Sequence, residues 1–98
     1  MPFRHVVLLR WQPETPAGHA DAVREALLAL AATLDGCESY ACGPSAGVVP
    51  AAYDFGLVAT FTSRAGWDAY MADPEHDRIR AELINPHVAE RATWQLEG

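Results

Sequence analysis

Two side chains suited to proton transfer lie close together in the second half of the chain, Tyr70 and His76. Between them Asp73-Pro74 favours the end of one helix and the start of the next, with Asp73 as the N-cap. His76 then falls in the first turn, where the positive end of the helix dipole disfavours an imidazolium. A neutral imidazole can act as a general base near pH 7, and a tyrosine hydroxyl can donate to a ketone or enolate oxygen.

Each candidate also has a purely structural interpretation. His76 can pack beneath its helix and bond a backbone carbonyl, and Tyr70 can be an amphipathic core residue. His5 is expected on the helix-covered side of the first strand, where it either packs in the core or lines a pocket mouth. His19 is expected on a helix surface. The spacing of His5, His76 and His87 matches no short metal-binding motif, so no metal is expected.

The elements that position these residues are indicated by hydrophobic periodicity and turn signals. Strands are expected at residues 3–11, 37–43, 53–61 and 88–96. Helices are expected between residues 15 and 35, 63 and 73, and 73 and 86. Thr15-Pro16 is expected to begin the first helix, as a cap followed by proline. This order predicts an α+β, ferredoxin-like fold, in which helices cover one face of a four-stranded antiparallel sheet.

Apolar alternation assigns the two faces of the predicted sheet. A site between sheet and helices is expected to contain, beside the three candidates, Val7, Leu9, Phe55, Leu57, Val23, Leu27, Ile79, Leu83 and His87. The open face is expected to carry Val6, Leu8 and Val58, mixed with Arg4, Arg10, Asp54 and Arg91. A bare sheet face with several large apolar groups usually has a partner, so a two-fold homodimer that buries both open faces is expected.

Length and composition narrow the classes of protein. The 98 residues favour one domain, residues 1–98, and half of them are apolar, too many for a disordered chain. The net charge of −6 with no basic run argues against nucleic acid as a partner, and the absence of lysine excludes a side-chain Schiff base. No apolar run approaches the ~20 residues that span a membrane, so no membrane partner is expected.

A cytoplasmic location is expected, because the N-terminus shows no signal-type segment. The two cysteines agree with this expectation. Cys37 and Cys42 are predicted to lie on opposite faces of one strand, about 16 Å apart, which is too far for a disulfide.

Three segments carry a resemblance to a known family: Arg4-His5-Val6-Val7-Leu8-Leu9, Ala69-Tyr70-Met71-Ala72-Asp73-Pro74-Glu75-His76, and Pro86 with Glu90-Arg91. Together they resemble the stress-responsive A/B barrel (Dabb) family, which implies a ferredoxin-like protomer whose sheet joins a dimeric barrel. The family includes plant stress proteins and a cofactor-free polyketide cyclase, which closes a linear poly-ketone by aldol condensation. Resemblance to that cyclase implies catalytic roles for Tyr70 and His76 and a pocket role for His5. Two further histidines of that cyclase align with Phe55 and Asp73 of this chain, and a tryptophan of its pocket aligns near His87.

The resemblance therefore implies a small cofactor-independent enzyme for aldol-type cyclisation, or related lyase or isomerase chemistry, on a carbonyl substrate. His76 would be the base, Tyr70 the oxyanion donor and His5 an orienting group. The alternative is a non-catalytic stress-responsive dimer that binds a small apolar ligand. A cofactor-free monooxygenase is a third option, which no motif favours. A cleft that reaches all three residues supports the enzyme, whereas a solid core around His76 supports the binding protein.

Overall fold

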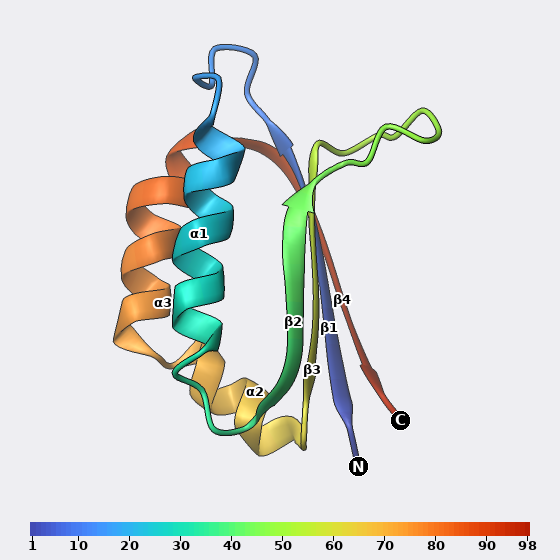
Figure 1. The fold of residues 1–98 in the computed structure, drawn as a ribbon, viewed down its shortest axis with the longest axis vertical. Helices are drawn as coiled ribbons and strands as arrows, with labels where there is room; N and C mark the ends of the chain where they lie inside the picture. Colours follow the sequence, from blue (N-terminus) through green and yellow to red (C-terminus); the bar gives the residue numbers. More distant parts are fainter.

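In the computed structural model, which describes residues 1–98, one sheet is covered on one side by helices (Figure 1). The strands are β1 (Phe3–Trp11), β2 (Cys37–Pro44), β3 (Phe55–Phe61) and β4 (Val88–Glu97). They are ordered β2-β3-β1-β4, and every neighbouring pair is antiparallel. The predicted ferredoxin-like α+β fold is confirmed, and the strands begin and end within two residues of the predicted bounds.

The helical layer contains α1 (His19–Ala31), α2 (Arg64–Met71) and α3 (Pro74–Ile79). A π-helical turn (Arg80–Ile84) and a 3-10 turn (Asn85–His87) continue α3 as far as β4. None of these helices has the length and apolar character that crossing a bilayer demands.

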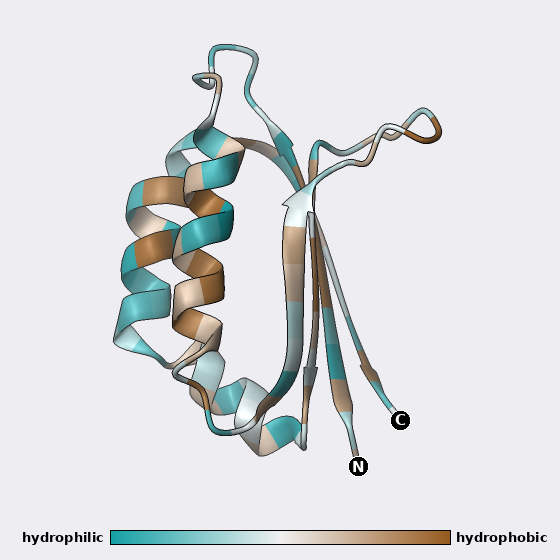
Figure 2. Cartoon of the chain, viewed as in Figure 1, coloured by the Kyte–Doolittle hydropathy of each residue, from teal (hydrophilic) through white to brown (hydrophobic).

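The hydrophobic core lies between the sheet and the helices, and Figure 2 shows apolar positions along α1, α3 and the strands. Alternate residues of a strand point to the same face, so β1 and β3 each contribute one apolar side. The core consists of Phe3, Leu9, Val23, Leu27, Leu30, Phe55, Leu57, Ala59, Phe61, Tyr70, Ile79 and Ile84. His5 and His76 are the polar residues buried within this layer.

Helix α1 begins later than the Thr15-Pro16 signal predicts. Thr15 N donates to Gln12 O across 3.0 Å, so Thr15 closes a separate turn, and its hydroxyl is buried without a hydrogen-bond partner. Gly18 precedes the helix with a φ of 84°, a left-handed conformation that glycine adopts without strain. The prediction that Thr15 caps the helix is therefore wrong.

The element after Asp73 is not a uniform α-helix, because its second part has π-helical hydrogen bonds. A π turn holds more residues than an α turn, so it rotates the side chains that follow. Ile84 consequently enters the core, with 7% of its surface exposed, whereas Leu83 of the predicted inner stripe is only half-buried.

The two cysteines lie on the same side of β2. The pairing register of β2 with β3 shifts between Cys37 and Ser39, and such a bulge inverts the side-chain alternation. Cys42 Sγ lies 4.0 Å from Arg24 O of α1, while Cys37 packs against the core, and both thiols are free. The prediction of opposite faces is therefore wrong, although neither cysteine forms a disulfide.

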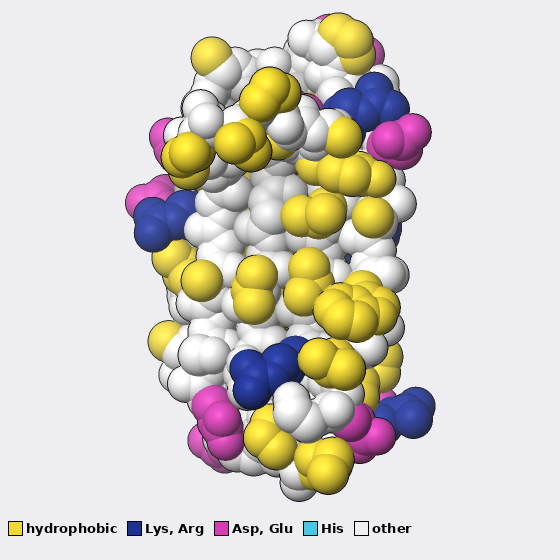
Figure 3. All heavy atoms as spheres, turned by 90° about the vertical axis from the view of Figure 1, so that its right-hand side faces the viewer, with side chains coloured by type: hydrophobic (Ala, Val, Ile, Leu, Met, Phe, Trp, Pro, Cys, Tyr) yellow, Lys and Arg dark blue, Asp and Glu magenta, His cyan; other side chains and the backbone are white.

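The face of the sheet away from the helices displays a patch of apolar side chains (Figure 3). We call it the open face; its exposed large apolar residues are Leu8, Val58, Trp94 and Leu96. Val6 pairs with Val58 on one side and with Trp94 on the other, so the patch is continuous across three strands. Arg91, predicted here, pairs with Leu9 and so belongs to the helix-covered face.

We predict that this open face forms the interface of a homodimer, with a standard interface of about 1,600 Å² in total. Val58→Arg should place a charge within the interface and give a monomer in light scattering, because an unpaired charge is costly to bury. Ala29→Arg, on the exposed side of α1, is the matched control and should remain dimeric. A parent protein that is monomeric at micromolar concentration would contradict the prediction.

We also predict that Asp73→Ala lowers the free energy of unfolding by about 1 kcal/mol. The Asp73 carboxylate accepts from the backbone N–H groups of Glu75 and His76, and the variant loses both bonds. Ser63→Ala is the matched control, because Ser63 occupies the N-cap position of α2 without a side-chain hydrogen bond. Equal losses of stability in the two variants, measured by urea unfolding, would show that the cap has no special role.

Candidate active site

A cavity of about 80 Å³ opens between the sheet and the helical layer. One side of its lining is apolar and comes from β1, β3 and α1: Val7, Leu9, Leu27, Phe55 and Leu57. The rest of the lining comes from α2, the α3 region and the inner faces of β1 and β4: His5, Tyr70, Met71, His76, Arg80, Ile84, Arg91 and Thr93. The structure thus brings His5, Tyr70 and His76 to one cavity, together with five of the nine predicted lining residues.

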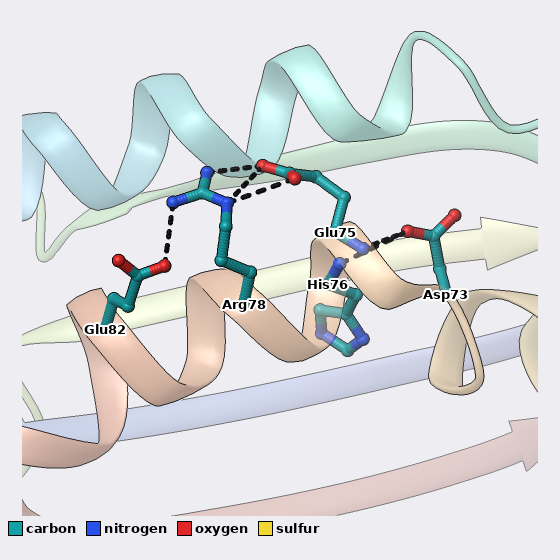
Figure 4. A network of polar contacts seen from close by, with 5 residues as sticks. All are labelled: Asp73, Glu75, His76, Arg78 and Glu82. Atoms are coloured by element: carbon teal, nitrogen blue, oxygen red, sulfur yellow. Dashed lines mark hydrogen bonds and ion pairs between the residues drawn. The ribbon is translucent and has the colours of Figure 1, made fainter.

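His76 is placed by the capped start of α3. Its backbone N–H donates to the Asp73 carboxylate across 3.2 Å, and its side chain points toward the strands, away from the Arg78 ion pairs (Figure 4). His76 Nδ1 lies 3.1 Å from the backbone oxygen of Tyr70. Because a carbonyl oxygen can only accept, Nδ1 carries the proton of the neutral ring. Nε2 therefore retains a lone pair, as a general base requires.

Burial is the main reason why the pKa of His76 falls to about 4. The positive charge of Arg80 and the proximity of His5 lower this pKa further, whereas the Tyr70 carbonyl and the Asp77 carboxylate oppose the decrease. The downward direction agrees with the expectation from the helix dipole, but desolvation is the larger cause. His76 is therefore neutral at pH 7.

Tyr70 packs directly on His76, with ring centroids 4.0 Å apart and an interplanar angle of 24°. Its hydroxyl lies 2.7 Å from the hydroxyl of Tyr40, which reaches it from β2. Burial raises the pKa of both hydroxyls, so both are protonated at pH 7. When Tyr40 donates to the Tyr70 oxygen, the Tyr70 proton is free for an oxygen atom in the cavity.

His5 is held by β4. The side-chain amide of Gln95 donates to His5 Nδ1 across 3.0 Å, and the two residues pair across β1 and β4. The proton of the neutral His5 ring therefore resides on Nε2, the opposite arrangement to that of His76. Burial also lowers the pKa of His5. The two histidines thus differ in role: His5 can donate through Nε2, whereas His76 can accept.

Four predicted lining residues lie elsewhere. Val23 and Ile79 are buried deeper in the core, and Leu83 is replaced at the cavity by Ile84. The His87 ring packs against the ring of His19, with centroids 4.1 Å apart and a tilt of 53°, and does not line the cavity of His5 and His76. The structure contains no cluster of three His, Cys, Asp or Glu side chains that could hold a metal ion.

Several residues around the cavity were not predicted from the sequence. On β4, Arg91, Thr93 and Gln95 pair with Leu9, Val7 and His5 respectively, so all three share the inner face. These three residues alternate along β4, and this spacing is the sequence signal for a shared face. Their charged and polar side chains instead suggested that this face of the strand points to solvent. Tyr40 gave no local signal, since its link to Tyr70 joins residues 30 apart in the sequence.

Comparison with known proteins agrees with this architecture. The sequence matches the stress responsive A/B barrel domain over residues 3–95. A dimeric ferredoxin-like protein from Thermobifida fusca is 32% identical, with a TM-score of 0.90, and the match covers 100% of this chain and 92% of that one. A comparison with curated proteins finds no significant match.

Two more distant solved structures share the fold. A Dabb family protein from Mesorhizobium loti is 14% identical, with a TM-score of 0.80 and coverage of 99% and 96% of the two chains. The hydroxynitrile lyase of Passiflora edulis is 17% identical, with a TM-score of 0.82 and coverage of 97% and 91%.

We predict that the low pKa of His76 makes the fold less stable in acid. The unfolded side chain, with a pKa near 6.5, takes up a proton before the folded one does. Stability is therefore lost as pH falls from 6.5 toward 4, by up to about 3 kcal/mol at roughly 1.4 kcal/mol per pKa unit. Urea unfolding should show a smaller loss over this range in His76→Gln than in the parent. An NMR midpoint for His76 at or above 6.5 would contradict the prediction.

Proposed function

The chain belongs to the stress responsive A/B barrel family, and from that premise we propose that it is a cofactor-independent enzyme that transfers a proton on a small carbonyl compound. The observation that carries the proposal is the shared cavity of Tyr70 and His76, whose remaining lining is largely apolar. An apolar, partly closed site strengthens polar interactions with charge that develops during a reaction.

The chemical roles follow from the hydrogen bonds of the three residues. His76 Nε2 removes a proton from the carbon beside a carbonyl group, and the electron pair of that bond moves onto the carbonyl oxygen. The Tyr70 hydroxyl donates to this oxygen, with Tyr40 supporting it from behind. The His5 Nε2–H orients the substrate. The enolate then attacks a second carbonyl carbon, and the protonated His76 returns its proton to the new alkoxide.

The same groups support the reverse reaction, a lyase step. His76 then takes the proton of a hydroxyl group, the oxygen of that group becomes a carbonyl as the carbon–carbon bond breaks, and the electron pair of the bond passes to the enolate oxygen beside Tyr70. The protonated His76 finally returns its proton to the enolate carbon. That a hydroxynitrile lyase shares this fold supports the chemistry on this scaffold.

The size of the cavity bears on the substrate. Its volume of about 80 Å³ is well below the roughly 300–1,000 Å³ typical of pockets for drug-sized ligands. This favours a compact carbonyl compound over a long linear poly-ketone. Polyketide cyclisation, which the sequence resemblance implies, is a more specific prediction within the same reaction class. A cytoplasmic location for the protein also stays a prediction.

The apolar lining also favours a second candidate function, the binding of a small apolar ligand without chemistry. The two functions differ in one measurable property. An enzyme with a working base exchanges the acidic C–H hydrogens of a bound carbonyl compound with solvent, whereas a binding protein does not.

We therefore predict catalysed hydrogen–deuterium exchange into small 1,3-dicarbonyl compounds in D₂O, followed by NMR. His76→Ala and Tyr70→Phe should each reduce the rate by about 10²–10⁴-fold, the typical contribution of such groups. Tyr40→Phe should cost less, because Tyr40 acts through Tyr70.

Two matched variants serve as controls. His19→Gln and Tyr53→Phe alter the same residue types outside the cavity and should retain the parent rate. If the parent protein still binds an apolar dye but exchanges none of the 1,3-dicarbonyl compounds faster than buffer alone does, the result would favour the binding protein over the enzyme.

A further inference from the structure

Two arginine side chains border a cavity that is otherwise mostly apolar, Arg80 and Arg91. Arg91 comes from the inner face of β4, where it pairs with Leu9. Arg80 begins the π-helical turn, close enough to His76 and Tyr70 for its charge to affect the pKa of both. The positive charge of Arg80 therefore stands beside the proposed reacting groups, and Arg91 adds a second charge to the same cavity.

Arg91 is in no ion pair. One of its N–H groups donates to Asn85 Oδ1 across 2.6 Å, and a guanidinium has five N–H donors in total. Four other arginines, Arg10, Arg64, Arg78 and Arg80, have carboxylate partners. Arg4 and Arg24 donate to backbone carbonyls and lie outside the cavity. In a chain with a net charge of −6, a cavity arginine without an acidic partner stands out as a position for a ligand anion.

Arg80 supplies the second half of the site. Its side chain is 30% exposed and is paired with Asp77, which itself lies outside the cavity. The ion pair occupies one terminal nitrogen of Arg80, so further donors of the fork remain for a ligand. Guanidinium groups match the planar geometry of a carboxylate and can bind it through two parallel hydrogen bonds.

We propose that the cavity takes a substrate that carries a carboxylate group, which Arg80 and Arg91 bind while its carbonyl end reaches Tyr70 and His76. Placement of the carbonyl end at Tyr70 and His76 rests on the function proposed above, whereas binding of the carboxylate by the two arginines does not. The substrate class is then a small keto acid, because the apolar side of the cavity leaves room only for a short carbon chain between the two ends.

The charge balance around His76 gives this arrangement a chemical consequence. The charged and titratable groups that face His76 are Arg80 and Asp77 from its own helical segment, Tyr70 from α2 and His5 from β1. A bound carboxylate offsets the charge of Arg80, so it raises the pKa of His76 from its low value. A general base is more effective when its pKa is nearer the working pH, so the substrate itself improves the base.

The test compares two probes that differ in one group. Acetoacetate and pentane-2,4-dione both carry a ketone and an acidic CH₂, but the carboxylate of the first is replaced by an acetyl group in the second. NMR titration of the full chain at pH 7 and low salt gives both dissociation constants. We expect acetoacetate to bind at least about tenfold more tightly, as a charge-assisted pair allows. We also expect acetoacetate to raise the NMR pKa of His76.

Single substitutions test which residues cause the preference for acetoacetate over pentane-2,4-dione. Arg91→Gln and Arg80→Gln should each remove most of the tenfold difference, and Arg91→Lys should keep part of it, because the charge remains without the planar fork. Arg64→Gln is the matched control: Arg64 pairs with Asp68 on the exposed side of α2, outside the cavity, and its loss should change nothing. The same spectra report whether each variant is folded.

Three results would overturn the inference: no measurable binding of acetoacetate, equal binding of the two probes, or a preference that survives in Arg91→Gln. Inorganic phosphate that binds more tightly than acetoacetate would assign the arginines to a phosphate group instead. The proposed function fails separately. Absence of deuterium exchange with a retained carboxylate preference would leave a carboxylate-binding protein, whereas exchange into pentane-2,4-dione without that preference would leave the enzyme and remove the arginine site.

Discussion

The short connection between α2 and α3 is the constraint on which the site depends. Asp73 ends α2 and caps α3 at once, through hydrogen bonds of 2.8 Å and 3.2 Å to the N–H groups of Glu75 and His76. Because so few residues join the helices, His76 must return over Tyr70, and its ring bonds the carbonyl of that residue. The stacked rings, the hydrogen-bonded tautomer and the free Nε2 lone pair of His76 all follow from this single turn.

Placing polar rings in an apolar layer carries a cost, and the structure meets it at the site by pairing the two phenols and the two imidazoles. The hydroxyls of Tyr40 and Tyr70 bond each other, His5 accepts from Gln95, and His76 donates to a backbone carbonyl. A buried polar group without a partner costs roughly 1–3 kcal/mol, so these bonds are conditions for the fold. Each histidine uses one ring nitrogen for its structural bond, which leaves the other available for chemistry. A structural role for His76 and a catalytic one are therefore compatible.

Features set by short-range signals could be predicted from the sequence, and features set by distant contacts could not. Asp73-Pro74, the four strands and the inner position of His5 depend on neighbouring residues, and the structure has them as expected. The π turn and the bulge in β2 are one-residue shifts that apolar periodicity does not reveal, and each moved a residue to another face. The face of Arg91 depends on its pairing with Leu9, far away in the sequence.

Strand β4 contributes side chains both to the open face and to the lining of the cavity. Its alternation sends Trp94 and Leu96 to the open face, while Arg91, Thr93 and Gln95 face the helices. As an edge strand it has a neighbour on one side only, β1, so within the chain its position rests on that single ladder. In the dimer that we predict, a second copy seated on Trp94 would restrain the same backbone that positions Arg91 at the cavity and Gln95 against His5. The predicted assembly at the open face would thus be linked to the geometry of the cavity through one strand, even though the two surfaces lie on opposite sides of the sheet.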